Sequence, residues 1–149
     1  PCPCGYQTDP LTPCTCPPNT IEKYKKKVSG PILDRFDIKI DVPRLKKTDY
    51  NDTQPKPSNT DLKQQIDTAR QAQYHRQKKS NARLSPKELK VHAPVPEESH
   101  HFLAEAVEKG LLTARAHDKV IKVARTIADL EGEDYIQHNT ILEALHYQN

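Results

Sequence analysis

Hydrophobic and polar residues follow two different periods along the chain. Over 36–42 every second residue is apolar, and charged residues stand between them: Phe36, Ile38, Ile40 and Val42. A period of two is typical of a half-buried strand, and Pro43 ends it. Because one strand does not make a sheet, we expect its partner strands to lie outside this segment.

From about residue 60 onward the apolar residues recur every three to four positions, which is typical of helices. Helices are predicted over about 60–78, from Ser85, over 96–109, from Thr113 to Gly132, and through Ile141 to Leu145. The start at Ser85 is especially clear, since Pro86 can occupy the first helical position and Glu88 can close a capping box. This part of the chain therefore predicts a small helical bundle.

The N-terminal part has a different character. Residues 1–18 are rich in proline and cysteine, so we expect no regular structure there without another source of order. A short helix should follow, with Asn19 as its N-cap. Glu22 at the third helical position would accept a hydrogen bond from the backbone N–H of Asn19, as in a capping box. Its apolar face would carry Ile21, Tyr24 and Val28, and lysines cover the rest. The polar residues 46–60 are interpreted as a linker.

Composition excludes several classes of protein. The 149 residues contain 13 prolines, 4 scattered glycines and no methionine. The chain has no apolar run of membrane-spanning length, no signal peptide and no glycine-rich phosphate loop. Since it starts at Pro1 and lacks methionine, we expect it to be a piece of a longer protein. A net charge of +3 is too small to establish a nucleic-acid partner, and nothing but the cysteines suggests secretion, so we expect a reducing, cytoplasmic setting.

The four cysteines form a CxC-x9-CxC pattern within the first 16 residues: Cys2, Cys4, Cys14 and Cys16. Four thiolates on two short arms can surround a tetrahedral Zn²⁺, which would order a segment too small to have its own core. The spacing departs from the common CxxC knuckle. Two disulfides, or four free structural cysteines, are the alternatives.

Two arginines stand at positions where a guanidinium could address a phosphate. Arg35 lies at a turn before the predicted strand, but for one isolated arginine the residues alone favour an ion pair with Asp34 or Asp37. Arg115 lies in the first turn of the longest helix, where a cation opposes the helix dipole. Pairing with an anion elsewhere and simple surface exposure both remain open for Arg115.

The other titratable residues give weaker signals. The histidines have no ligand-like spacing and are interpreted as surface or capping residues: His100, His101, His117 and His138. The lysine runs at 23–27, 46–47 and 78–79 are typical of solvated faces, with unspecific contact to a DNA backbone as the alternative. No Ser-His-Asp, Cys-His or paired-carboxylate arrangement is present.

Taken together, three blocks resemble one family. They read PCPCG…CTC, SGPILDRFDI and LTARAHDKVIKVARTIADLEG, and they are similar to the C-terminal half of the magnesium-chelatase-like AAA+ ATPases, within them the ComM/YifB competence-protein group. The resemblance covers nearly the whole chain. It implies a remnant of the AAA+ α/β core with a Cys-rich loop over 1–43, a linker over 44–60, and a helical lid domain over 61–149. The implied fold class is mainly α, with one strand left from the core.

The resemblance also implies residue roles. Arg35 matches the arginine finger, which reaches the nucleotide of a neighbouring subunit, and Arg115 matches sensor 2, with Thr113 where the family block has Ser. Guanidinium groups in such roles accelerate phosphoryl transfer by about 10³–10⁵ where an arginine finger has been measured. The implied cofactors are ATP and Mg²⁺, and the implied assembly is a ring, as in the family's hexamers.

The family's Walker A, Walker B and sensor 1 motifs precede the first cysteine block and are absent here, so we expect this chain to hydrolyse no ATP by itself. The cysteine block favours a motor that acts on branched DNA over a chelatase subunit that drives metal insertion into a porphyrin. A non-enzymatic module that binds DNA or a protein through the cysteine loop and the lysine-rich helix is the alternative from another class.

Overall fold

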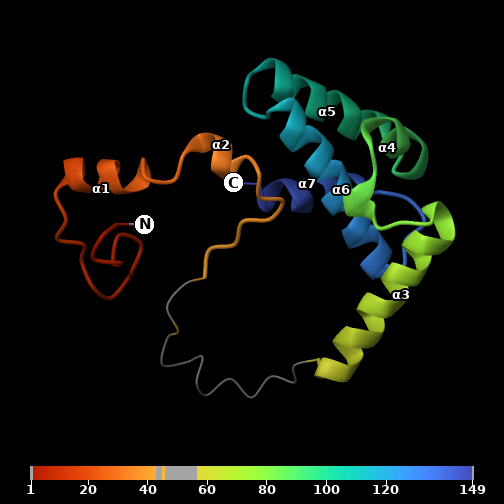
Figure 1. The fold of residues 1–149 in the computed structure, drawn as a ribbon, viewed down its shortest axis with the longest axis horizontal. Coiled ribbons are helices and arrows are strands. Elements are labelled where there is room, and N and C mark those ends of the chain that lie inside the picture. The colour runs from red at the N-terminus through yellow and green to blue at the C-terminus, as the bar shows by residue number, and fades with distance from the viewer. Residues whose placement is uncertain (1, 43–44, 46–56, 149) are drawn as a thin grey trace. The chain divides into compact units, whose positions relative to one another are not determined.

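The computed structural model describes residues 2–42, 45 and 57–148, and every regular element among them is helical (Figure 1). The chain divides into two compact units. We call Pro1–Phe36 with Ile40–Pro55 the N-terminal unit, and Asp37–Lys39 with Lys56–Asn149 the helical unit. The predicted linker over 44–60 lies almost wholly outside the described residues.

The N-terminal unit contains two short helices, α1 (Pro18–Lys25) and α2 (Gly30–Leu33). The predicted helix after the cysteines is therefore present, but the prediction of Asn19 as its cap is wrong. The N-cap is Pro17, whose carbonyl accepts hydrogen bonds from Thr20 and Ile21. Proline suits the first helical position, because its φ is already helical, so Pro18 starts the helix early and leaves Asn19 inside the first turn.

The predicted strand over 36–42 is not confirmed, since no strand occurs in the part of the chain that the structure describes. Residues 37–39 run extended beside the end of the helical unit instead. There Lys39 donates its backbone N–H to the carbonyl of Tyr147 at 2.8 Å, and Gln148 donates to the carbonyl of Asp37 at 2.6 Å. A strand needs a neighbouring strand to form a ladder, and these contacts come from the end of a helix.

The helical unit confirms the predicted helices. They are α3 (Asn59–Gln77), the 3₁₀ turn η2 (Asn81–Arg83), α4 (Pro86–His92), α5 (Glu97–Glu108), α6 (Ala114–Glu131) and α7 (His138–His146). Ser58 and Ser85 both form capping boxes, with Asp61 and Glu88 respectively. Helix α6 begins at the cap Thr113 and ends at Gly132, which has φ +74°. That conformation suits glycine, because it has no Cβ to clash.

Helix α6 is the centre of the helical unit and packs against α3, α4, α5 and α7 (Figure 1). One hydrophobic cluster holds these helices together: Leu84, Leu89, Ala93, Leu103, Val120, Ile121, Val123, Ala124, Ile136, Ile141 and Ala144. Because the apolar stripe of α6 is buried on several sides, this helix supplies the largest share of the core.

Helix α3 is only half engaged in this packing. Ala69, Gln73 and Gln77 in its second half are buried, whereas Leu62 and Ile66 in its first half are 42% and 46% exposed. Figure 1 shows the first turns of α3 extending past the other helices of the unit. None of the helices in the described residues is both long enough and apolar enough to cross a bilayer.

Candidate functional site

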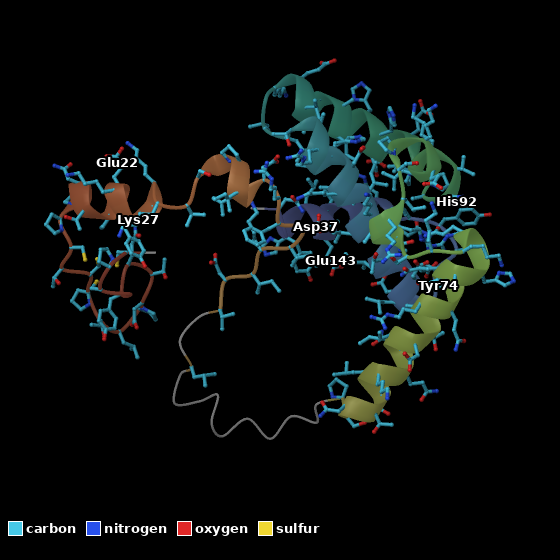
Figure 2. The ribbon with its side chains drawn as sticks, viewed as in Figure 1. Glu22, Lys27, Asp37, Tyr74, His92 and Glu143 are labelled. Atoms are coloured by element: carbon cyan, nitrogen blue, oxygen red, sulfur yellow. The ribbon has the colours of Figure 1, made fainter. Side chains whose placement is uncertain are left out.

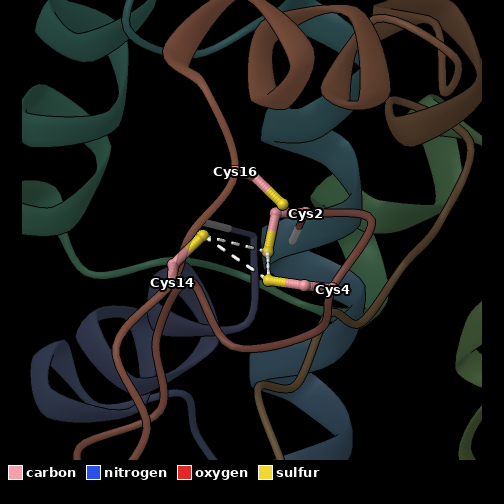
Figure 3. Close-up of side chains that lie close together, drawn as sticks. All are labelled: Cys2, Cys4, Cys14 and Cys16. Carbon is pink, nitrogen blue, oxygen red and sulfur yellow. Dashed lines mark hydrogen bonds between the residues drawn. The ribbon is translucent and has the colours of Figure 1, made fainter.

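The four cysteines gather into one cluster in the N-terminal unit, and Figure 3 shows their sulfurs turned toward one another. The Sγ atom of Cys2 lies 3.2 Å from that of Cys4 and 3.5 Å from that of Cys14, and the Cys4 and Cys14 sulfurs are 3.6 Å apart. All four Sγ atoms lie within 4.8 Å of one another. All four are free cysteines, so the disulfide alternative finds no support in this arrangement.

Two local turns bring the cysteine arms together. In the first arm, Gly5 donates its N–H to the carbonyl of Cys2 at 3.1 Å and has φ +83°. Only glycine adopts this conformation without strain, so it reverses the chain directly after Cys4. Between the arms, the carboxylate of Asp9 accepts hydrogen bonds from the N–H groups of Leu11 and Thr12, an Asx turn that aims the chain back toward Cys14.

The thiols of the cluster shift one another's pKa. Burial raises the pKa of Cys2, but hydrogen bonds from Cys4 and Cys14 outweigh it and lower that pKa to about 6. For Cys14, a backbone hydrogen bond from Cys16 lowers the pKa, while burial and its partners Cys2 and Cys4 raise it to about 12. Thiolates this close repel one another, so a cation among the sulfurs would favour their deprotonation.

Arg35 follows α2 in the N-terminal unit and is exposed. Its Nη1 donates to the carbonyl of Pro31 at 2.7 Å, a bond to the helix that directly precedes it. Asp37 forms an ion pair with Lys119 of α6 at 3.4 Å. The guanidinium is thus held by the backbone of its own turn and faces solvent.

Arg115 lies in the first turn of α6 in the helical unit and is also exposed. The cap of this helix is the hydroxyl of Thr113, which accepts from the N–H of Ala116 at 3.1 Å. The predicted position of Arg115 in the first turn of the helix that follows Thr113 is therefore confirmed. Arg35 and Arg115 belong to different units, so each is described only within its own unit.

A buried polar network in the helical unit escaped the sequence analysis. Asp129 on α6 is 5% exposed and lies at its centre. Its carboxylate accepts two hydrogen bonds from Arg76 of α3, at 2.8 and 2.9 Å, one from the Asn81 amide at 2.7 Å, and one from Arg125 at 3.1 Å. The network therefore ties α3 and η2 to α6.

Arg125 extends this network to the loop after α6. Its side chain is 1% exposed and donates to the carbonyls of Glu133 and Asp134. Burial lowers the pKa of Arg125, although the Asp129 carboxylate opposes this. Burial also raises the pKa of Asp129, but the hydrogen bonds from Arg76 and Asn81 outweigh it and lower that pKa. The sequence signal was a charged pair four residues apart inside an apolar stripe, which indicates a buried ion pair.

The histidines were interpreted as surface or capping residues, and His100 and His101 are indeed exposed. His138 is different, because its ring packs edge-on against Phe102 and its Nδ1 lies 2.8 Å from the hydroxyl of Ser99. Ser99 is fully buried, so this pair joins α7 to α5. The role of His138 is therefore in helix packing.

Comparison with protein families places both units in one family. A model described as "Magnesium chelatase, subunit ChlI C-terminal" matches residues 56–148, and one described as "Magnesium chelatase, subunit ChlI" matches residues 1–50. The chain belongs to the magnesium chelatase ChlI family. The family resemblance of the three sequence blocks is thereby confirmed.

Individual relatives agree with the family. The chain is 35% identical over 99% of its length to competence protein ComM of Haemophilus influenzae. It is 34% identical over 89% of its length to proteins named YifB in Salmonella typhimurium and Escherichia coli. It spans 29% of the length of the ComM protein and 26% of each YifB protein, so it corresponds to less than a third of these relatives.

Proposed function

We propose that this chain supplies two arginines to ATP hydrolysis in a ring-shaped AAA+ motor of the magnesium chelatase ChlI family. Arg35 is the arginine finger that reaches the nucleotide of a neighbouring subunit, and Arg115 is sensor 2 of the helical lid. Family membership over both units carries the proposal. The nucleotide, with Mg²⁺, binds at motifs that this chain lacks, so these residues act on phosphates held elsewhere in the ring.

The local settings of the two arginines support these roles. Arg35 is exposed, and the hydrogen bond from its Nη1 to the Pro31 carbonyl orients its guanidinium relative to α2. Arg115 is exposed in the first turn of α6, where a cation opposes the helix dipole and a phosphate nearby would stabilise it. A guanidinium that meets a phosphoryl oxygen bidentately stabilises the charge that develops during transfer.

We also propose that the cysteine cluster holds a structural Zn²⁺. A tetrahedral site with Zn–S bonds of about 2.3 Å places its sulfurs about 3.8 Å apart, which agrees with sulfurs that all lie within 4.8 Å. A bound Zn²⁺ supplies the charge that four thiolates need. Cys2, Cys4, Cys14 and Cys16 are all used, which leaves no open position for catalysis and favours a structural role.

The proposed substrate of the full-length motor is DNA. Support comes from the similarity to a protein named for competence over 99% of the chain. Two alternatives remain: a chelatase-type subunit that drives metal insertion, which the family name favours, and a non-enzymatic module that binds DNA or protein. In the chelatase alternative, a porphyrin rather than DNA stimulates ATP hydrolysis. In the binding-module alternative, the protein hydrolyses no ATP.

The test uses the full-length protein that contains this chain. DNA should stimulate its ATPase activity, and Arg35→Ala should lower kcat by about 10³-fold or more with little change in KM. Arg83→Ala is the matched control, because Arg83 is an exposed arginine on η2 and should leave kcat unchanged. Arg115→Ala should also lower the rate of hydrolysis.

Mixed rings test whether Arg35 acts on a neighbour. Subunits carrying Arg35→Ala, mixed with subunits whose own nucleotide-binding lysine is replaced, should recover activity at the interfaces where an intact finger meets an intact nucleotide site. Full ATPase activity of rings in which every subunit carries Arg35→Ala would refute the role of Arg35 as arginine finger. Stimulation by a porphyrin and not by DNA would favour the chelatase alternative, and absence of ATPase activity would favour the binding module.

A further inference from the structure

Helix α1 carries an exposed basic surface that the proposed function leaves unused. Four of the five residues over 23–27 are lysines, and all of them are exposed. The side chain of Lys26 is 73% exposed. No residue of α1 is buried, so the helix is not part of a core among the described residues.

Three of these lysines form what we call the lysine face: Lys23 and Lys26, which are three residues apart, and Lys27, which follows the helix and contacts Tyr24. Positions three and four residues apart meet on one side of a helix, and Lys26, although it follows α1, keeps helical φ and ψ of −66° and −14°. Glu22 borders the face and pairs with Lys26 at 2.6 Å. Figure 2 labels Glu22 and Lys27 at α1. One carboxylate against four lysines leaves this stretch strongly positive.

An aromatic ring lies at the edge of the lysine face. The Nζ of Lys27 stands 5.5 Å from the centroid of the Tyr24 ring, and Tyr24 is 38% exposed. Lysines interleaved with an exposed aromatic ring suit single-stranded nucleic acid, in which phosphates meet cations and bases stack on rings. A membrane surface fits less well, because α1 contains no Trp or Phe to enter the bilayer.

The cysteine cluster positions this helix. Cys16 is separated from α1 only by Pro17, and Pro18 begins the helix. Two consecutive prolines restrict the backbone, so the direction of α1 follows from the direction in which the chain leaves the cluster. The loop that gathers the four sulfurs therefore leads directly into the helix that carries the lysine face.

We propose that the lysine face of α1 binds the phosphate backbone of single-stranded nucleic acid, with Tyr24 stacking on a base. This inference rests on the proposed function, since it names the surface by which the DNA motor would hold its strand. The contact is independent of base sequence, because lysines address phosphates and an aromatic ring stacks on any base.

The test measures binding of this chain to a fluorescein-labelled mixed-sequence single strand, from about 50 to 200 mM salt. The variant replaces Lys23, Lys26 and Lys27 with Gln. The matched control replaces Lys63, Lys87 and Lys90 with Gln, since these are exposed lysines of the helical unit. Both variants remove three charges, so a difference between them reports position and not net charge. Circular dichroism should show equal helicity for all three proteins.

Wild type should show a slope of log K against log salt of about −2, from about −0.7 for each of three phosphates neutralised on a single strand. The lysine-face variant should lose most of this slope, and the control should keep it. Tyr24→Leu should weaken binding of the single strand by about tenfold and binding of the matching duplex much less.

Three results would overturn the inference: equal slopes for the two triple variants, no binding by wild type, or binding of anionic phosphatidylserine vesicles in preference to the strand. If the full-length protein has DNA-stimulated ATPase activity while the two triple variants behave alike, the surface is wrongly assigned and the motor function stands. If the slope depends on the lysine face but the full-length protein has no ATPase activity, the surface stands and the motor function fails.

Discussion

The two units of this chain are ordered by different forces. The helical unit buries a continuous apolar cluster around α6 and adds a hydrogen-bonded network centred on Asp129. In the N-terminal unit, Cys2 is the one buried residue among those described before residue 57. A segment with so little apolar burial needs another source of order, and metal binding by the gathered sulfurs is the source that we propose.

Because the two units differ in buried apolar surface, their functional residues stand on scaffolds of different stability. The helical unit can fold on hydrophobic burial, so Arg115 sits on a scaffold that needs no ligand. The N-terminal unit carries Arg35 and the lysine face on short helices without buried residues. We therefore expect the helical unit to survive perturbations that disorder the N-terminal unit. The predictions below test this, beginning with the largest effect.

Removal of the proposed Zn²⁺ should produce the largest difference in folding between the two units. Structural Zn²⁺ contributes about 10–16 kcal/mol in small zinc domains at neutral pH, so Cys4→Ser or a strong chelator should unfold the cysteine loop. In an HSQC spectrum, the peaks of residues 2–33 should move into the narrow range of chemical shifts that is typical of unfolded chains. The peaks of residues 59–148 should keep their positions. Metal analysis of the purified protein checks the premise, and wild type without bound metal would contradict it.

Asp129→Asn should have the largest effect within the helical unit. It leaves the guanidinium of Arg125, which is 1% exposed, without its carboxylate partner. Breaking a buried ion pair in this way costs about 3–5 kcal/mol of unfolding free energy. Asp67→Asn on the exposed face of α3 is the control and should change stability by less than about 0.5 kcal/mol. Urea denaturation followed by circular dichroism measures both.

Acid should weaken the helical unit through carboxyl groups whose pKa is lowered in the folded state. The pKa of Asp129 is lowered in the folded state, and Lys79 and Ser85 lower the pKa of Glu88 to about 2. A group whose folded pKa is depressed stabilises the fold above its unfolded pKa of about 4 and loses this contribution as the pH falls through the folded value. Stability should therefore decrease between about pH 4 and 2. In Asp129→Asn this loss should be smaller, and an unchanged pH profile would refute the assignment.

The smallest expected effect concerns a helix cap. The hydroxyl of Ser85 accepts from the N–H of Glu88, and the Glu88 carboxylate returns a bond of 2.9 Å to the N–H of Ser85. Ser85→Ala should destabilise the helical unit by about 1 kcal/mol, because α4 keeps its packing and loses only its cap. Ser85→Asp should retain most of the stability, and thermal melts compare the two.

Much of the helical unit followed from local sequence signals. Ser85 with Glu88, Thr113 and Gly132 each mark a helix end by its own chemistry, and the structure places helix ends at those residues. The apolar stripe of α6 was visible because a period of 3.6 residues needs no knowledge of partners. The cysteine cluster was predicted from residue type and spacing, since two CxC arms can meet only if a turn joins them.

Other features depended on the tertiary structure. Leu62 and Ile66 are exposed because α3 extends past its partner helices, and the helical period alone does not show where that packing ends. The position of Asn19 was misjudged because two prolines determine where α1 starts. Arg76 and Asp129 are 53 residues apart, and no local pattern indicates that they meet.

Local spacing and order along the chain were enough to predict the family, the helices of the helical unit with ends at Ser85, Thr113 and Gly132, and the four cysteines as one cluster. Which polar groups are buried together, and which lysines are exposed to solvent, could be seen only in the packed structure. Burial and pairing are set by neighbours distant in sequence, and these exist only once the helices have packed.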